Sequence, residues 1–177
     1  MPEGLITVRA ITLADGKPLP LRQACDYGWI VPERAPAGWD VGADEVCIGR
    51  NLFLDGGRQL LAYSFGFRAP IENYTVQNFA VGTGLTAATV ADVALEAPVA
   101  LASQGGATMA PISGVDFLTA FVMRVNFTIS VGDANGYLLT EFGLLSGNGT
   151  LVTRKVRSVG INKTSDYAPS ICHRIRF

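Results

Sequence analysis

Residues 117–131 read FLTAFVMRVNFTISV and carry the strongest structural signal in the chain. Apolar side chains recur at positions 117, 121, 123, 125, 127, 129 and 131, and only Thr119 interrupts the row. Alternation of β-branched and aromatic residues with polar ones predicts a strand buried on one face. We therefore expect one long strand over 117–131. The expected core residues are Phe121, Met123, Val125, Phe127 and, further along the chain, Phe142.

The chain that follows predicts more strands joined by tight turns. An Asn-Gly pair at 135–136 suits a reversal, and a second one at 148–149 separates two strand-like runs, which predicts a hairpin over 137–159. The final residues 171–177, ICHRIRF, alternate as well. Strands joined by tight turns pair antiparallel. The predicted fold class is therefore mainly β, an antiparallel β-sandwich or jelly-roll-like fold with an irregular N-terminal arm.

The first half of the chain gives weaker signals. Residues 74–82 read as a strand, and a short helix is expected around 57–63. Residues 1–50 contain four prolines within 18–36, which disfavours long helices and central strands, although ITVRAITL near the start could be one strand. We expect residues 1–50 to be an arm or lobe and residues 51–177 to be the β-sandwich domain.

The arm carries large aromatic side chains that are typical interface anchors. The candidates are Tyr27, Trp29 and Trp39. Two interpretations are open: the arm docks on a neighbouring subunit, or it folds back and completes the sandwich of its own chain.

Residues 82–87, Gly-Thr-Gly-Leu-Thr-Ala, match the G-x-G-x-x-[GA] pattern of dinucleotide-binding turns. That turn needs a βαβ unit and a parallel sheet. The helix that should follow contains several β-branched residues, and the later strands are antiparallel. We therefore interpret Gly82 and Gly84 as turn residues with positive φ. We expect no nucleotide and no other cofactor.

Charged residues are sparse, at 16% of the chain, and unevenly distributed. A surface this poor in charge indicates that part of it is covered by a partner, or simply a compact β protein rich in small residues. Residues 1–148 hold eight Lys or Arg against fourteen Asp or Glu, whereas residues 149–177 hold six against one. The basic end is either a docking patch or the internal partner of carboxylates from the first part. The candidate interface residues there are Arg154, Arg157, Arg174 and Arg176.

Catalytic and metal-binding patterns are weak. His173 is the only histidine and lies on the apolar side of a terminal strand, which favours a structural role over a catalytic one. Three cysteines without C-x-x-C spacing favour free thiols, with a Cys25–Cys47 bridge as the alternative. Asp133 and Glu141 could face each other as paired carboxylates. In the simpler interpretation, Asp133 begins a turn and Glu141 pairs with a basic residue of the facing strand. We expect no catalytic residue and no metal site.

Three segments resemble small virion structural proteins of tailed bacteriophages. In that group a strand leads into V-G-T-G, an Ala/Thr-rich loop carries A-L-E, and a later strand carries E-F-G-L before a hairpin. The matching residues are 81–84, 94–96 and 141–144, and the resemblance covers about residues 51–160. It implies a β-sandwich without catalysis that decorates or joins parts of a virion.

The resemblance implies a protein of the virion, made in the host cytoplasm, whose partners are further copies of itself and other virion proteins such as the major capsid protein. Capsid decoration or cement is the preferred role. A tail, baseplate or head-fibre component, or a carbohydrate-binding β-sandwich, is the alternative. The net charge of −1 and the lack of a long apolar run give no reason to expect nucleic acid or membrane as a partner, and we see no signal peptide.

Overall fold

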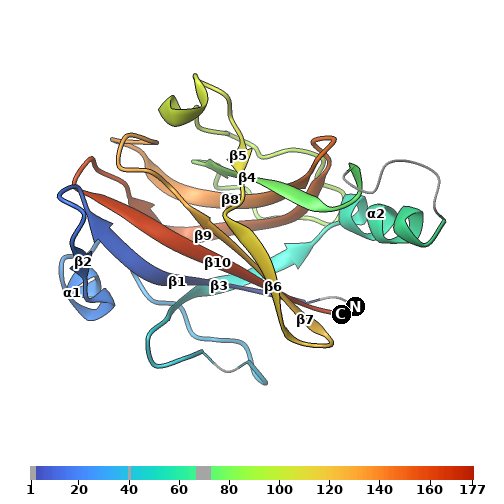
Figure 1. Ribbon diagram of the computed structural model, residues 1–177, viewed down its shortest axis with the longest axis horizontal. Helices are drawn as coiled ribbons and strands as arrows, with labels where there is room; N and C mark the ends of the chain where they lie inside the picture. Colours follow the sequence, from blue (N-terminus) through green and yellow to red (C-terminus); the bar gives the residue numbers. More distant parts are fainter. Residues whose placement is uncertain (1–2, 40, 67–72) are drawn as a thin grey trace.

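The computed structural model describes residues 3–39, 41–66 and 73–177, and its described part is built mainly from β-strands (Figure 1). The strands are β1 Glu3–Leu13, β2 Pro18–Leu19, β3 Val46–Phe53, β4 Val76–Gly82, β5 Ala110–Pro111, β6 Gly114–Thr119, β7 Val122–Thr128, β8 Leu138–Ser146, β9 Leu151–Asn162 and β10 Tyr167–Arg176. The helices are α1 Leu21–Asp26 and α2 Asp55–Gly66, with a 3₁₀ turn, η2, at Ala102–Gln104.

All of these strands pair antiparallel in one sheet, in the order β5-β4-β8-β9-β3-β1-β10-β7-β6, with β2 beside β1. Strand β3 links the two halves, because residues 46–51 pair with β1 and residues 52–53 pair with β9. Residues 110–119 link the two outer ends of the sheet in the same way. Ala110 pairs with β4 at one end, and residues 114–119 form β6, which pairs with β7 at the other end. The sheet is therefore curled into a barrel-like sandwich, which confirms the predicted antiparallel β fold (Figure 1).

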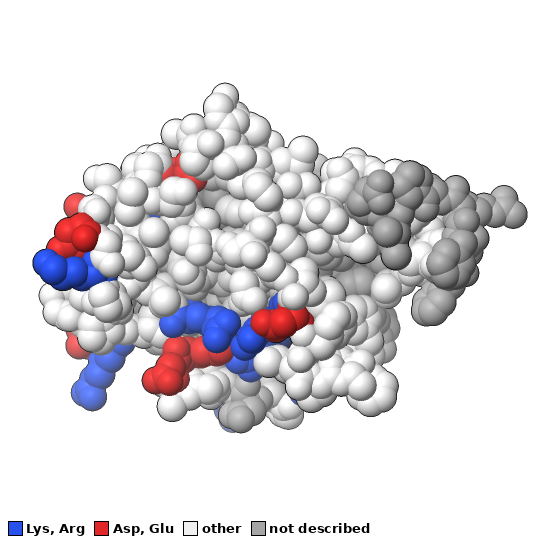
Figure 2. All heavy atoms as spheres, viewed as in Figure 1, with Lys and Arg blue, Asp and Glu red and all other residues white. Residues whose placement is uncertain are grey.

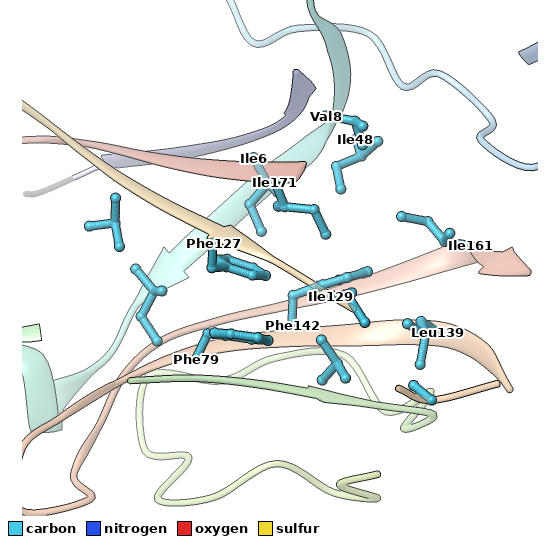
Figure 3. Close-up of a cluster of buried hydrophobic side chains, with 14 of the residues drawn as sticks. Ile6, Val8, Ile48, Phe79, Phe127, Ile129, Leu139, Phe142, Ile161 and Ile171 are labelled. Atoms are coloured by element: carbon cyan, nitrogen blue, oxygen red, sulfur yellow. The ribbon is translucent and has the colours of Figure 1, made fainter. Parts of the chain in front are cut away.

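The core lies inside this curl. Phe79 of β4 and Phe127 of β7 stack at a centroid distance of 4.2 Å, although their strands stand near opposite ends of the sheet order (Figure 3). Ile6, Ile171 and Phe142 are buried in the same cluster. The predicted core positions Val125, Phe127 and Phe142 are confirmed, and Met123 is partly buried against them.

The prediction of one strand over 117–131 is wrong. The chain forms a hairpin there, in which β6 and β7 are joined through Ala120 and Phe121. Phe121 lies in this turn and is 68% exposed, so its assignment to the core is wrong too. The turn contains no Gly, Pro, Asn or Asp, so the apolar–polar alternation of the sequence continues across it and gives no sign of a turn. Thr119, the one break in the apolar row, marks its position.

The other elements agree with the sequence. The hairpin expected over 137–159 is β8 and β9, the strand expected over 74–82 is β4, and the helix expected around 57–63 is α2. Within the described residues, no helix is both long enough and apolar enough to cross a bilayer.

The expected division at residue 50 falls inside β3, and this corrects the expectation of a separate N-terminal arm. Strand β1 occupies a central position, paired with β10 on one side and β3 on the other. Its partner β10 lies at the far end of the sequence, so local patterning gives no sign of the pairing. The connection from Pro20 to Glu45 leaves the sheet and returns to it through β3.

Candidate functional site

The two tryptophans of this connection pack on their own chain. The Trp29 ring stacks on Tyr167 of β10 at 4.4 Å and 6° between the ring planes. Trp39 is buried, and the Arg176 guanidinium lies 4.3 Å from its ring centroid. Tyr27 tilts against Trp29 and keeps about half of its surface exposed. Of the two interpretations of the arm, these contacts favour the one in which it folds back.

Three of the four candidate arginines, Arg154, Arg157 and Arg174, are buried and paired inside the chain. Arg157 of β9 binds the Glu33 carboxylate at 3.1 Å, and Arg174 of β10 binds Glu45. Both carboxylates come from the connection between α1 and β3, so these ion pairs also fix the course of that connection. Arg176, on the rim, donates to the Gly38 carbonyl at 2.8 Å. The basic C-terminal end is therefore largely neutralised within the fold, the second of the two expected arrangements.

The third buried arginine, Arg154 of β9, is paired in an ionic cluster with the buried Glu141 and with Asp92 and Glu96, which lie nearer the surface. Its Nε donates to Glu141 Oε1 of β8 at 2.7 Å, and its Nη1 binds Asp92. Its Nη2 lies 3.6 Å from Glu96 Oε2. We call these four residues the Glu141 cluster. Glu141 pairs with a basic residue of the facing strand, Arg154, as expected in the simpler interpretation. Asp133 instead accepts from the backbone N–H and hydroxyl of Ser103.

The Glu141 cluster holds the loop of residues 83–97 against the sheet. Glu141 accepts hydrogen bonds from the backbone N–H groups of Glu96 and Ala97, at 2.8 and 3.2 Å. Glu96 in turn accepts from the backbone N–H and the hydroxyl of Thr86, both at 2.8 Å. Carboxylates that accept backbone N–H bonds fix a loop strongly, because charge-assisted hydrogen bonds are about twice as strong as neutral ones. The C-terminal end of the 83–97 loop is thus tied to the buried Glu141 carboxylate, and Thr86 near its other end is tied to Glu96.

Gly82 and Gly84 serve this cluster in a way that the sequence did not predict. Neither residue has φ in the left-handed region, so the expectation of positive φ is wrong. A Cβ on Gly82 would lie 2.4 Å from Glu141 Oε2, and one on Gly84 would lie 2.7 Å from the same atom. Both distances are far inside van der Waals contact. The two glycines leave room for the Glu141 carboxylate, and a Cβ would also meet the Ala97 carbonyl at Gly82 and the Glu96 side chain at Gly84.

The charges of the cluster support one another. Burial opposes the charge of Arg154, but the hydrogen bonds to Asp92 and Glu141 outweigh it and raise the Arg154 pKa. Burial likewise opposes ionisation of Asp92, yet hydrogen bonds from Thr89 and Arg154 hold the Asp92 pKa below its usual value. The backbone N–H of Thr86 lowers the pKa of Glu96. These three groups are charged at neutral pH, and the oxygens of Glu141 are occupied by donors of the chain, so the cluster is arranged to hold structure.

The 83–97 loop presents apolar side chains outward from this rigid base. Val93 is 86% exposed and Leu85 is 71% exposed. Val90 and Val93 also line a hollow of about 640 Å³ that the start of α2 borders at Asp55 and Gln59. Apolar side chains exposed on a fixed loop are unfavourable in water and are typical of contact surfaces.

His173 belongs to the core. It is fully buried, its ring tilts against Phe127 at 5.5 Å, and Asn51 Nδ2 lies 3.3 Å from its Nδ1. Burial lowers the pKa of His173 to about 3, so the ring is neutral at pH 7. Its structural role was expected, but its complete burial exceeds the half-burial that the terminal strand suggested. All three cysteines are free thiols.

Sequence reasoning missed Asp92 and Glu96 as members of a site. Glu96 stood in one of the three segments that resemble virion proteins, and the structure brings all three together: Gly82 and Gly84 from the first, Glu96 from the second and Glu141 from the third. Comparison of the chain with protein-family models, with curated proteins and with solved structures finds no match.

Proposed function

We propose that this protein is a non-enzymatic structural component of a tailed-bacteriophage virion, and that it decorates the capsid by binding the major capsid lattice. The observation that carries the proposal is the Glu141 cluster. The three segments that resemble virion proteins converge there and form one unit, a loop anchored by a buried ion pair.

The anchoring suits a protein whose task is attachment. A loop fixed before binding loses little conformational freedom when it docks, which increases affinity for a given contact area. Leu85 and Val93 supply apolar area on that loop, and charged side chains of the loop itself, such as Asp92, are engaged internally. We propose that the 83–97 loop is the surface that contacts the capsid protein.

A tail, baseplate or head-fibre position remains the second proposal, since the same loop could dock on any of these. The carbohydrate-binding alternative is less well supported. Trp29 and Trp39 are engaged by Tyr167 and Arg176, so of the three aromatic side chains of the arm only Tyr27 keeps about half of its surface free to stack on a sugar ring.

The test uses heads and tails purified separately from virions of the encoding phage, grown with this gene deleted. The purified chain should cosediment with heads. A double variant, Leu85→Lys with Val93→Lys, should remain folded and lose that binding. The matched control is Val159→Lys, which changes a half-exposed valine on β9 and should bind normally.

Binding to tails and not to heads would replace decoration by the second proposal. Binding to neither, together with a signal on a glycan array, would favour the carbohydrate-binding alternative. Normal head binding by the double variant would show that the 83–97 loop is not the contact.

A further inference from the structure

The outer end of the sheet at β6 is an exposed edge with a single charged residue, Asp116. Among the described residues, β6 is the last strand on its side of the sheet, paired with β7 alone. The opposite end is β5, which is two residues long and contains Pro111. Short strands and proline are the usual protection of a sheet edge against pairing with another chain. Strand β6 is six residues long and contains neither proline nor lysine.

The side chains at this edge are large and apolar. Phe117 is 69% exposed and Phe121 is 68% exposed, and the backbone N–H of Phe177 donates to the Phe121 carbonyl, so the half-exposed C-terminal Phe177 lies beside the hairpin tip. Phe117 stands opposite Met123, and Val115 opposite the buried Val125. Residues directly opposite share a face of a sheet. The core-facing apolar surface therefore continues out to the edge, where nothing in the described chain covers it.

We propose that a second copy of this chain covers this edge, with β6 pairing antiparallel to β6 of the partner across a twofold axis. A twofold contact places the same surface of two copies face to face, so unpaired charges on that surface would meet like charges and repel. The run from 101 to 121 contains a single charged residue, Asp116, and Arg124 neutralises it through two hydrogen bonds of 2.7 Å. Figure 2 shows the upper middle of this face almost without charged side chains, while Lys, Arg, Asp and Glu gather at its left end and in a mixed cluster below the centre, near β6 and β7.

The area fits a dimer. At roughly 200 Å² for a phenylalanine side chain, the exposed parts of Phe117 and Phe121 amount to about 270 Å² per copy. Val115, Leu118 and the edge backbone add to this, so the area buried by a twofold contact approaches the roughly 1,000 Å² of a specific interface. This inference concerns copies in solution and does not rest on the proposed virion role.

Sedimentation equilibrium of the full chain tests the proposal. The wild type should reach twice the mass of one chain at micromolar concentration. Phe117→Lys should weaken the dimer at least tenfold, because two lysines meet across the axis in a desolvated contact. The matched control is Val93→Lys, which adds the same charge to an exposed valine away from β6 and should leave the dimer intact.

Hydrogen exchange gives a second measurement on the unmodified chain. Amides of residues 114–119 should become more protected as concentration rises, and those of the 83–97 loop should not. A wild type that stays monomeric at 100-fold higher concentration would overturn the proposal. A folded Phe117→Lys variant that dimerises normally, or concentration-independent exchange in β6, would overturn the assignment of the contact to this edge. The Leu85 and Val93 double variant should dimerise even if it loses head binding, which separates this proposal from the preceding one.

Discussion

Glu141 and Arg154 depend on each other because each is a charge taken out of water. Glu141 is fully buried, and the Arg154 side chain is 4% exposed. A buried ion pair adds little to the free energy of unfolding when compared with a well-packed apolar pair. Removing one partner, however, leaves the other charged and unpaired, which lowers the free energy of unfolding by about 3–5 kcal/mol.

Arg154→Met should therefore lower the free energy of unfolding by about 3–5 kcal/mol, since it leaves the buried Glu141 carboxylate without its guanidinium. The measurement is urea denaturation at neutral pH. Arg124→Met is the control, because Arg124 pairs with the half-exposed Asp116 and should cost about 1 kcal/mol or less. Equal losses of unfolding free energy in the two variants would mean that the Glu141–Arg154 pair contributes no more to stability than a surface ion pair.

Gly84→Ala should destabilise the fold by about 1–3 kcal/mol, the usual cost of forcing an extra methyl group into a packed site. The new Cβ would overlap Glu141 Oε2 and the Glu96 side chain. Gly132→Ala is the control, because a Cβ there meets nothing within 4 Å. In the double variant with Glu141→Ala the cost of Gly84→Ala should shrink, as expected for residues in contact. A cost that is unchanged in that background would argue against the carboxylate as the reason for the glycine.

His173 makes the stability depend on pH in a direction that can be worked out. Its pKa is 6.5 when unfolded and about 3 in the fold. Between these values the unfolded chain binds a proton that the folded chain does not, so stability falls as pH falls below 6.5, by up to about 1.4 kcal/mol per pH unit. The stability difference between the wild type and His173→Gln should therefore change by about 2 kcal/mol between pH 7 and pH 5, to the disadvantage of the wild type. A pH-independent difference would indicate that the ring is not held neutral.

At the scale of single elements, the β6–β7 hairpin separates what alternation can predict from what it cannot. Alternation fixes which side chains share a face, and Val125 and Phe127 are buried accordingly. It says nothing about where a strand ends when the turn lacks the usual residues, and nothing about whether a face is covered. The expected strand therefore contained a turn, and Phe121 lies outside the core.

Phe127→Ala should lower the free energy of unfolding by about 3–5 kcal/mol, the typical cost for a buried phenylalanine. Phe121→Ala is the matched control, measured in dilute solution so that contact between copies does not contribute, and it should cost less than about 0.5 kcal/mol. Guanidinium melts of both variants check this. Comparable losses would place Phe121 in the core after all.

The Glu141 cluster was predictable only in part, for a related reason. The ion pair of Glu141 with a facing strand follows from the β8–β9 hairpin, because hairpin partners are local. Asp92 and Glu96 reach the same arginine from a loop with little periodicity, and only the folded chain brings them there. The glycine pattern was visible, but its cause lay in a carboxylate nearly sixty residues away.

At the scale of the whole molecule, the N-terminal strands β1 and β3 are an integral part of the sheet. Strand β1 separates β3 from β10, and Glu33 and Glu45 neutralise arginines of β9 and β10. The prolines that suggested a separate arm lie between β1 and β3, in β2 or in the connection that follows it.

Deleting residues 1–47 should therefore abolish cooperative unfolding. The deletion removes a central strand and leaves Arg157 and Arg174 buried without their carboxylates. Thermal melts followed by circular dichroism, with the full chain as the reference, measure this. A truncated chain that melts in one sharp transition would restore the view that these residues are an accessory arm.

The pairing of β1 with β10 also sets the order of events during synthesis. Glu3 stands opposite Arg176, so β1 leaves the ribosome long before its neighbour β10 has been made. Contacts of such long sequence separation form slowly, and an unpaired apolar strand is prone to aggregate meanwhile. The nascent chain must therefore keep this side of β1 unpaired until β10 has been made, and a chain cut within β10 leaves a strand in the middle of the sheet without part of its partner.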